Sequence, residues 1–165
     1  MKKILLLIGI VLTLLLCTNG LQAQTSQPKL DQFEMYTHFV GSWQANVGED
    51  TNEVWDCKQY GKAFVINVYL LVKDQKIPLY INNVSFDSME GKFKGFVLWN
   101  NGGYNTWIGS YINEKDFIVE FVDNFNPEII KRKANMQMVN PQERIFTQYN
   151  MDGVKISEVK YIKIK

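Results

Sequence analysis

The chain has 165 residues, of which 46% are hydrophobic and 21% charged, and its formal net charge is +1 at pH 7. So balanced a charge leaves no basic surface that would favour nucleic acid or an anionic membrane as a partner. One histidine and two cysteines are too few for a structural zinc site or for a disulfide-rich scaffold.

The first 23 residues have the pattern of a signal peptide. Two lysines at positions 2 and 3 precede an apolar run from Ile4 to Leu16, and the chain becomes polar after Ala23. The run is shorter than the roughly 20 apolar residues of a transmembrane helix, and Ala23 is a small residue suited to cleavage. We expect cleavage after Ala23 and a secreted or periplasmic mature protein.

Lipid attachment at Cys17 is the alternative to simple cleavage. A small residue is expected before an acylated cysteine, whereas the residue here is Leu16. The sequence therefore favours a mature protein with no stable membrane anchor. Cys57 is then the one cysteine left, and we expect a buried apolar side chain; a reactive thiol is the alternative.

The mature chain is long enough for one domain with a core of its own. Residues 24–28 are short and polar, which is typical of a linker, and 29–165 form the predicted domain. Between Lys29 and Val40 apolar residues recur at helical intervals, which predicts one short amphipathic helix that stops before Gly41.

After Gly41 the pattern changes to β-branched and aromatic segments separated by turn residues. We expect about ten strands: Ser42–Val47, Asn52–Tyr60, Ala63–Lys73, Ile77–Phe86, Lys92–Trp99, Tyr104–Ile112, Phe117–Phe125, Ile129–Val139, Arg144–Met151 and Val154–Lys165. Short loops join adjacent antiparallel strands, and a long meander closes to remove its edges. The prediction is all-β, a closed up-and-down barrel of about 8–10 strands with a short N-terminal helix, and not a parallel α/β fold.

Alternation along the strands indicates which side chains face inward. Phe117, Val119 and Phe121 share one side of their strand, and Trp107, Gly109 and Tyr111 share a side of another, where Gly109 leaves room beside two large rings. In Ala63–Lys73 both faces are apolar, so alternation leaves the inward face open.

Arg132 shares a register with Ile130, Ala134, Met136 and Met138, which predicts a basic side chain inside the barrel. It could orient the carboxylate of an amphipathic ligand; the alternatives are an outward side chain or an ion pair with Glu158. The candidate ligand-binding residues are Arg132, Trp107, Tyr111, Phe117, Phe121, Met136 and Trp55.

The sequence contains no convincing catalytic set. His38 is the single histidine and lies outside any nucleophile motif, and the acidic residues fall mostly in turns. We therefore expect no enzyme activity, metal or cofactor. Haem held through His38, and an enzyme that uses tyrosine and carboxylate groups, are the less favoured alternatives.

The passage Phe39-Val40-Gly41-Ser42-Trp43 resembles the first signature of the lipocalin and calycin superfamily. The segment Asn101–Trp107 and the final Glu158/Tyr161 extend the resemblance to secreted bacterial lipocalin-like proteins whose function is unassigned. The resemblance implies that Trp43, which follows Gly41, plugs one end of the barrel. It also implies that a basic residue of the last strand packs across the Trp43 indole, and Lys163 is the residue in the corresponding position.

These observations predict a protein that binds a small apolar or amphipathic ligand, such as a lipid or fatty acid, inside its barrel. The alternative is a barrel filled by its own side chains that acts through its loops as an interaction module. A cavity inside the barrel favours the first interpretation, and a filled interior favours the second.

Overall fold

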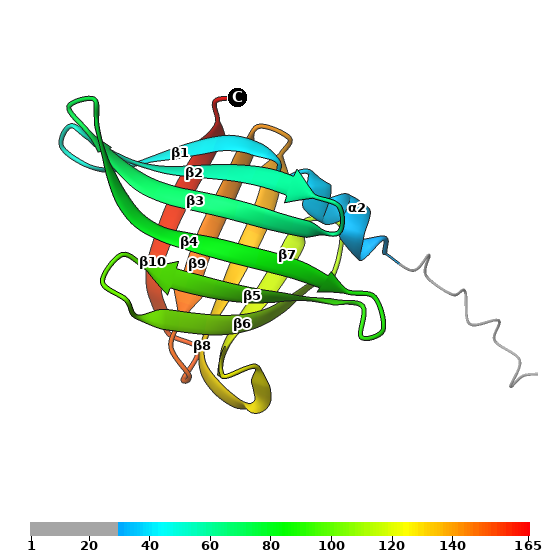
Figure 1. The fold of residues 1–165 in the computed structure, drawn as a ribbon. Helices are drawn as coiled ribbons and strands as arrows, with labels where there is room; N and C mark the ends of the chain where they lie inside the picture. Colours follow the sequence, from blue (N-terminus) through cyan, green and yellow to red (C-terminus); the bar gives the residue numbers. More distant parts are fainter. Residues whose placement is uncertain (1–29) are drawn as a thin grey trace, which may run out of the picture.

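The computed structural model describes residues 30–165, which form one closed antiparallel barrel of ten strands with one short helix (Figure 1). The predicted signal peptide, Cys17 and the linker at 24–28 lie outside these residues. The elements are α2 (Gln32–Thr37), β1 (Gly41–Gly48), β2 (Thr51–Tyr60), β3 (Ala63–Val72), β4 (Gln75–Asp87), β5 (Lys92–Trp99), β6 (Tyr104–Tyr111), β7 (Asp116–Asp123), β8 (Asn126–Asn140), β9 (Glu143–Tyr149) and β10 (Lys155–Lys163).

Each strand pairs with the next one along the chain, and β10 returns to pair with β1. This order confirms the predicted up-and-down barrel. Short turns make neighbours in sequence into neighbours in space, and closure gives every strand two hydrogen-bonded partners.

The helix is shorter than the sequence predicted. It covers six residues, Gln32–Thr37, in place of Lys29–Val40. The Asp31 side chain accepts a hydrogen bond from the Glu34 backbone N–H at 3.0 Å and so caps the start. The helix ends early because the chain must turn into β1. Phe39, in this connection, is buried beneath α2 in the barrel core.

One predicted turn is misplaced. The sequence put it at Asn126-Pro127, whereas the chain reverses at Asn124 and Phe125, which have φ values of +45° and +62°. Asp123 pairs with Asn126 across this turn. The backbone N–H of Phe125 donates to the Thr106 side chain at 3.1 Å, which holds the turn to β6.

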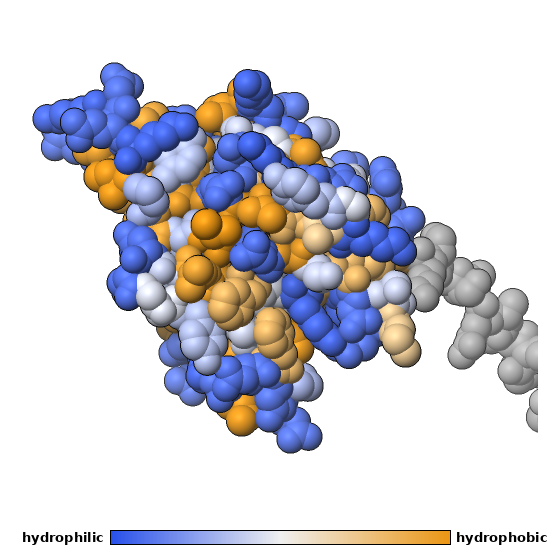
Figure 2. Space-filling model, in the orientation of Figure 1, coloured by the Kyte–Doolittle hydropathy of each residue, from blue (hydrophilic) through white to orange (hydrophobic). Residues whose placement is uncertain are grey.

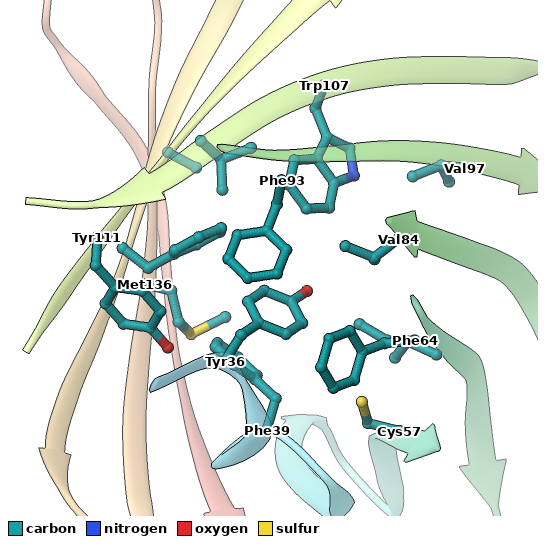
Figure 3. Packing of buried hydrophobic residues seen from close by; sticks show 14 of the residues in the cluster. Tyr36, Phe39, Cys57, Phe64, Val84, Phe93, Val97, Trp107, Tyr111 and Met136 are labelled. Atoms are coloured by element: carbon teal, nitrogen blue, oxygen red, sulfur yellow. The ribbon is translucent and has the colours of Figure 1, made fainter. Parts of the chain in front are cut away.

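Aromatic packing joins α2 to the barrel. Tyr36 projects from the helix into the barrel interior, next to Phe64 and Phe93 (Figure 3). It also meets the Phe117 ring edge-on. Its ring centroid lies 4.3 Å from that of Phe93 and 4.8 Å from that of Phe64. The helix therefore closes one end of the barrel through its side chains.

Strand pairing decides the inward face of β3. Ile66 lies opposite Cys57, and Phe64, Ile66 and Val68 are all buried. Alternation could not decide this face because the other side of the strand is also apolar.

On the outer surface of the barrel, apolar residues gather over the face formed by β2 to β6, with hydrophilic residues around them (Figure 2). Within residues 30–165, no helix has the length and apolar character needed to cross a membrane.

Candidate ligand-binding site

The barrel interior holds a partly open cavity of about 620 Å³. Tyr36 and Phe39 form its inner end, beneath α2. At the other end its lining includes Trp99, Tyr104 and Asn124, which adjoin the β5–β6 and β7–β8 hairpins. The volume falls in the range of natural small-molecule sites.

Aromatic rings dominate the lining. The aromatic members come from α2, from the connection between α2 and β1, and from six strands, and they are Tyr36, Phe39, Trp55, Tyr80, Trp99, Tyr104, Trp107, Phe117, Phe121 and Phe146. Aliphatic side chains and Met136 fill in between them. The polar groups are fewer, with Arg132 and Lys131 the positively charged ones.

Six of the seven candidate ligand-binding residues line this cavity: Arg132, Trp107, Phe117, Phe121, Met136 and Trp55. The seventh, Tyr111, does not. It shares the inward side of β6 with Trp107, but it lies at the helix-covered end, where its hydroxyl donates to the Met35 carbonyl oxygen at 3.1 Å. Contact with α2 thus removes Tyr111 from the cavity lining.

Arg132 lies in the wall of the cavity, directly across the strand pair from Phe121. Its Cζ atom is 4.2 Å from the centroid of the Phe121 ring. Within residues 30–165 no carboxylate lies within 4 Å of its guanidinium nitrogens, and no side-chain hydrogen bond engages it. Partial burial lowers the pKa of Arg132, but an arginine side chain stays protonated at neutral pH. The group is a positive charge beside apolar rings.

The alternative ion pair between Arg132 and Glu158 does not form. Glu158 lies on the outer face of β10, where its carboxylate accepts from Lys155 at 3.2 Å and from Thr147 at 3.4 Å. The two strands do not neighbour each other, since β9 lies between β8 and β10. An outward Arg132, the other alternative, is also wrong, because Arg132 lines the cavity beside Phe121.

A β-bulge beside Arg132 changes the predicted alternation. Phe121 pairs with Arg132, but the next residue, Val122, pairs with Ile130, so Lys131 is an extra residue in β8. Ile130 therefore does not share the inward side of Arg132, contrary to the sequence-based prediction. Lys131 borders the cavity and forms an ion pair with Asp123.

Three indoles of the lining are held by side-chain acceptors. Trp55 Nε1 donates to Glu53 at 2.5 Å, and Trp107 Nε1 donates to Asn82 at 3.1 Å. Trp99 Nε1 donates to the Asn105 amide oxygen at 2.9 Å when that amide is oriented to satisfy both of its groups. The bonded N–H groups fix the planes of the rings, and the aromatic walls are therefore preformed.

Gly95 brings Trp107 against the wall of the barrel. The two residues are paired across β5 and β6, and a Cβ atom at Gly95 would lie 1.9 Å from the indole. A side chain there would push the ring away. Gly109 also leaves room for a ring, but the ring is Phe117 of β7 and not Trp107 or Tyr111 of its own strand: a Cβ atom at this position would lie 2.8 Å from the Phe117 ring.

Several lining residues were not predicted from the sequence, among them Tyr80, Asn82, Trp99, Asn105 and Gln148. Tyr80 and Asn82 alternate along β4, but polar residues occupy both faces of that strand and conceal the pattern. Tyr80 packs on Trp99 with ring centroids 4.6 Å apart, and burial raises the pKa of its hydroxyl well above the usual range.

The end of the barrel that α2 covers is closed around Trp43, which contacts Phe39. Its indole is 1% exposed and donates from Nε1 to the Phe39 carbonyl oxygen at 2.9 Å. Gly41 has a φ of +118°, and a Cβ atom there would meet the Lys165 carbonyl oxygen at 2.3 Å. Lys163 pairs with Trp43, and its Nζ lies 5.3 Å from the indole centroid, as the resemblance implied.

A second cation, Arg144 of β9, packs closer to the same indole. Its Cζ lies 4.6 Å from the Trp43 ring and 4.0 Å from the Phe39 ring, and the residue is 2% exposed. Burial lowers its pKa, whereas the nearby hydroxyl of Tyr111 favours the charged form. The resemblance alone directed attention to Lys163 and missed this arginine.

The less favoured chemistries gain no geometric support. His38 is exposed at the end of α2 and does not line the cavity. Within residues 30–165 no group of three or more His, Cys, Asp or Glu side chains is placed to hold a metal ion. Glu53 adjoins the cavity wall, but its Oε1 atom already accepts from Trp55 and from the Tyr161 hydroxyl, the latter at 2.6 Å.

The fold, the Trp43 plug and its basic partners are consistent with a calycin-like barrel. Comparison with known protein families and with curated proteins finds no match.

Proposed function

We propose that this protein binds a small amphipathic anion, such as a fatty acid or another organic acid, inside its barrel. The observation that carries the proposal is Arg132: a guanidinium with no carboxylate partner among the described residues, in the wall of an aromatic cavity. A charge taken partly out of water costs free energy unless it is paired, and a ligand carboxylate would pair the half-buried Arg132.

The cavity supplies the remaining affinity. Apolar surface that leaves water contributes roughly 25 cal/mol per Å² before the entropy cost of association. A filled barrel, the alternative expected for an interaction module, would leave no such space. The 620 Å³ cavity favours ligand binding over that alternative.

The test is Arg132→Met with a fluorescent fatty acid as probe. We expect the fold to persist and the affinity to fall by one to two orders of magnitude, since a charge-assisted hydrogen bond contributes about 1.5–3 kcal/mol. Lys133→Met is the matched control, because Lys133 is the next residue of β8 but faces outward and pairs with Glu120. Equal affinities for wild type and Arg132→Met would refute the proposal.

We also propose that the protein acts after export, as a secreted or periplasmic protein. The support is the N-terminal pattern of two lysines, an apolar run and Ala23. N-terminal sequencing and intact mass of protein from its native host test it. A start near Gln24 without lipid is expected, whereas a diacylglycerol adduct on Cys17 would contradict it.

A further inference from the structure

We infer that the ligand of this cavity is a flat aromatic or conjugated acid, and not a saturated acyl chain. The inference rests on the proposed function and names its ligand class. It comes from the arrangement of the rings and of Arg132, beyond the presence of a cavity.

Ring pairs face the cavity from different sides of the barrel. Trp55 of β2 and Phe146 of β9 have centroids 5.7 Å apart, and Tyr80 of β4 lies 4.6 Å from Trp99 of β5. An aromatic ligand gains a favourable contribution from each well-placed ring contact beyond the area that it buries. A saturated chain receives the area contribution alone.

The rings are also fixed before a ligand arrives. Glu53, Asn82 and Asn105 each hold one indole N–H, so the walls cannot repack freely around a ligand of another shape. A rigid planar molecule loses little conformational freedom in such a site, whereas a flexible chain must freeze its rotatable bonds. Preformed walls therefore favour a rigid ligand.

Arg132 adds a constraint on the headgroup. Its Cζ atom lies 4.2 Å from the centroid of the Phe121 ring, and no side chain of residues 30–165 accepts a hydrogen bond from its N–H donors. A carboxylate binds such donors in the plane of the guanidinium through two parallel bonds. In an aromatic acid the carboxylate is conjugated with the ring, so a carboxylate paired with Arg132 brings a planar ring into the aromatic cavity that Arg132 lines.

The experiment compares three acids that share a carbon count by isothermal titration calorimetry on the whole mature protein: 2-anthroate, its fully hydrogenated analogue and pentadecanoate. We expect 2-anthroate to bind at least about tenfold more tightly than either saturated acid. Trp99→Leu removes one aromatic wall of the cavity. It should reduce the ratio of the affinities for 2-anthroate and for the saturated acids, mainly because 2-anthroate binds less tightly. Circular dichroism establishes that the variant is folded.

The outcomes separate this inference from the proposed function. If pentadecanoate binds as tightly as 2-anthroate and Arg132→Met weakens it, the ligand class is wrong while the proposed function stands. If no acid binds, or if Arg132→Met leaves every affinity unchanged, the proposed function fails and the inference fails with it. A tenfold preference that survives unchanged in Trp99→Leu would also overturn the role assigned to the walls.

Discussion

The guanidinium carbon of Arg144 lies 4.6 Å from the centroid of the Trp43 ring, inside the closed end of the barrel. The Arg144 Nε and Nη2 atoms are buried without hydrogen-bond partners among the described residues. The Trp43 and Phe39 ring faces therefore stabilise the cation in place of a carboxylate.

Replacing Arg144 separates its volume from its charge. Arg144→Ala should lower the free energy of unfolding by about 2–4 kcal/mol because it leaves a void against two rings. Arg144→Met keeps much of the side-chain volume and removes a buried charge with unsatisfied donors. This variant should therefore lose less than about 1.5 kcal/mol of the free energy of unfolding. Urea denaturation measures both. Equal losses would show that the cation–π contacts outweigh the volume.

Trp43→Ala should reduce stability by about 3–5 kcal/mol, because it removes a large aromatic side chain that is 1% exposed. Trp43→Phe is the control that keeps a ring and loses the hydrogen bond to Phe39; its loss should be clearly smaller. Equilibrium denaturation provides the measurement. A loss below about 1 kcal/mol for Trp43→Ala would argue against its role as the plug of the barrel.

Gly95→Ala should displace the Trp107 indole, since the new Cβ atom would lie 1.9 Å from the ring. We expect a cost of about 1–3 kcal/mol from overpacking and weaker binding of an aromatic acid. Gly48→Ala is the control, because its nearest contact would be an ordinary 3.7 Å. Thermal unfolding and a binding titration check both effects, and a Gly95→Ala protein with unchanged Trp107 fluorescence would contradict the prediction.

Stability should fall on the alkaline side. Burial raises the pKa of the Cys57 thiol to about 12, above the roughly 8.5 of an exposed thiol. Above the ordinary pKa the unfolded chain releases this proton while the folded chain keeps it. The free energy of unfolding should therefore decrease with rising pH, by up to about 1.4 kcal/mol per pH unit for this group.

Cys57→Ala should flatten the slope of unfolding free energy between about pH 9 and 10, before unfolded tyrosines ionise. Above pH 10 the slope should remain, because burial also raises the pKa of Tyr111 to about 12. Urea titrations across this pH range give the slopes. Rapid labelling of native Cys57 by a thiol reagent at pH 8 would contradict the protected thiol on which the prediction depends.

The sequence by itself determined the fold class and much of the cavity wall. Turn residues divide the chain into about ten segments, and a side-chain period of two predicts Phe117 and Phe121 on the inward side of their strand and indicates an inward Arg132. The Gly41–Trp43 pattern likewise located the closed end. These features are local, since each depends on residues near one another in the chain.

Only the tertiary structure decided which side chains meet across the strands. Gly95 lies against Trp107 because β5 and β6 pair in one register, and Arg144 reaches Trp43 although β10 lies between their strands. The bulge at Lys131 and the contact of Tyr111 with α2 altered the lining in the same way. Register, bulges and barrel closure depend on pairing between distant segments, which alternation within one strand does not encode.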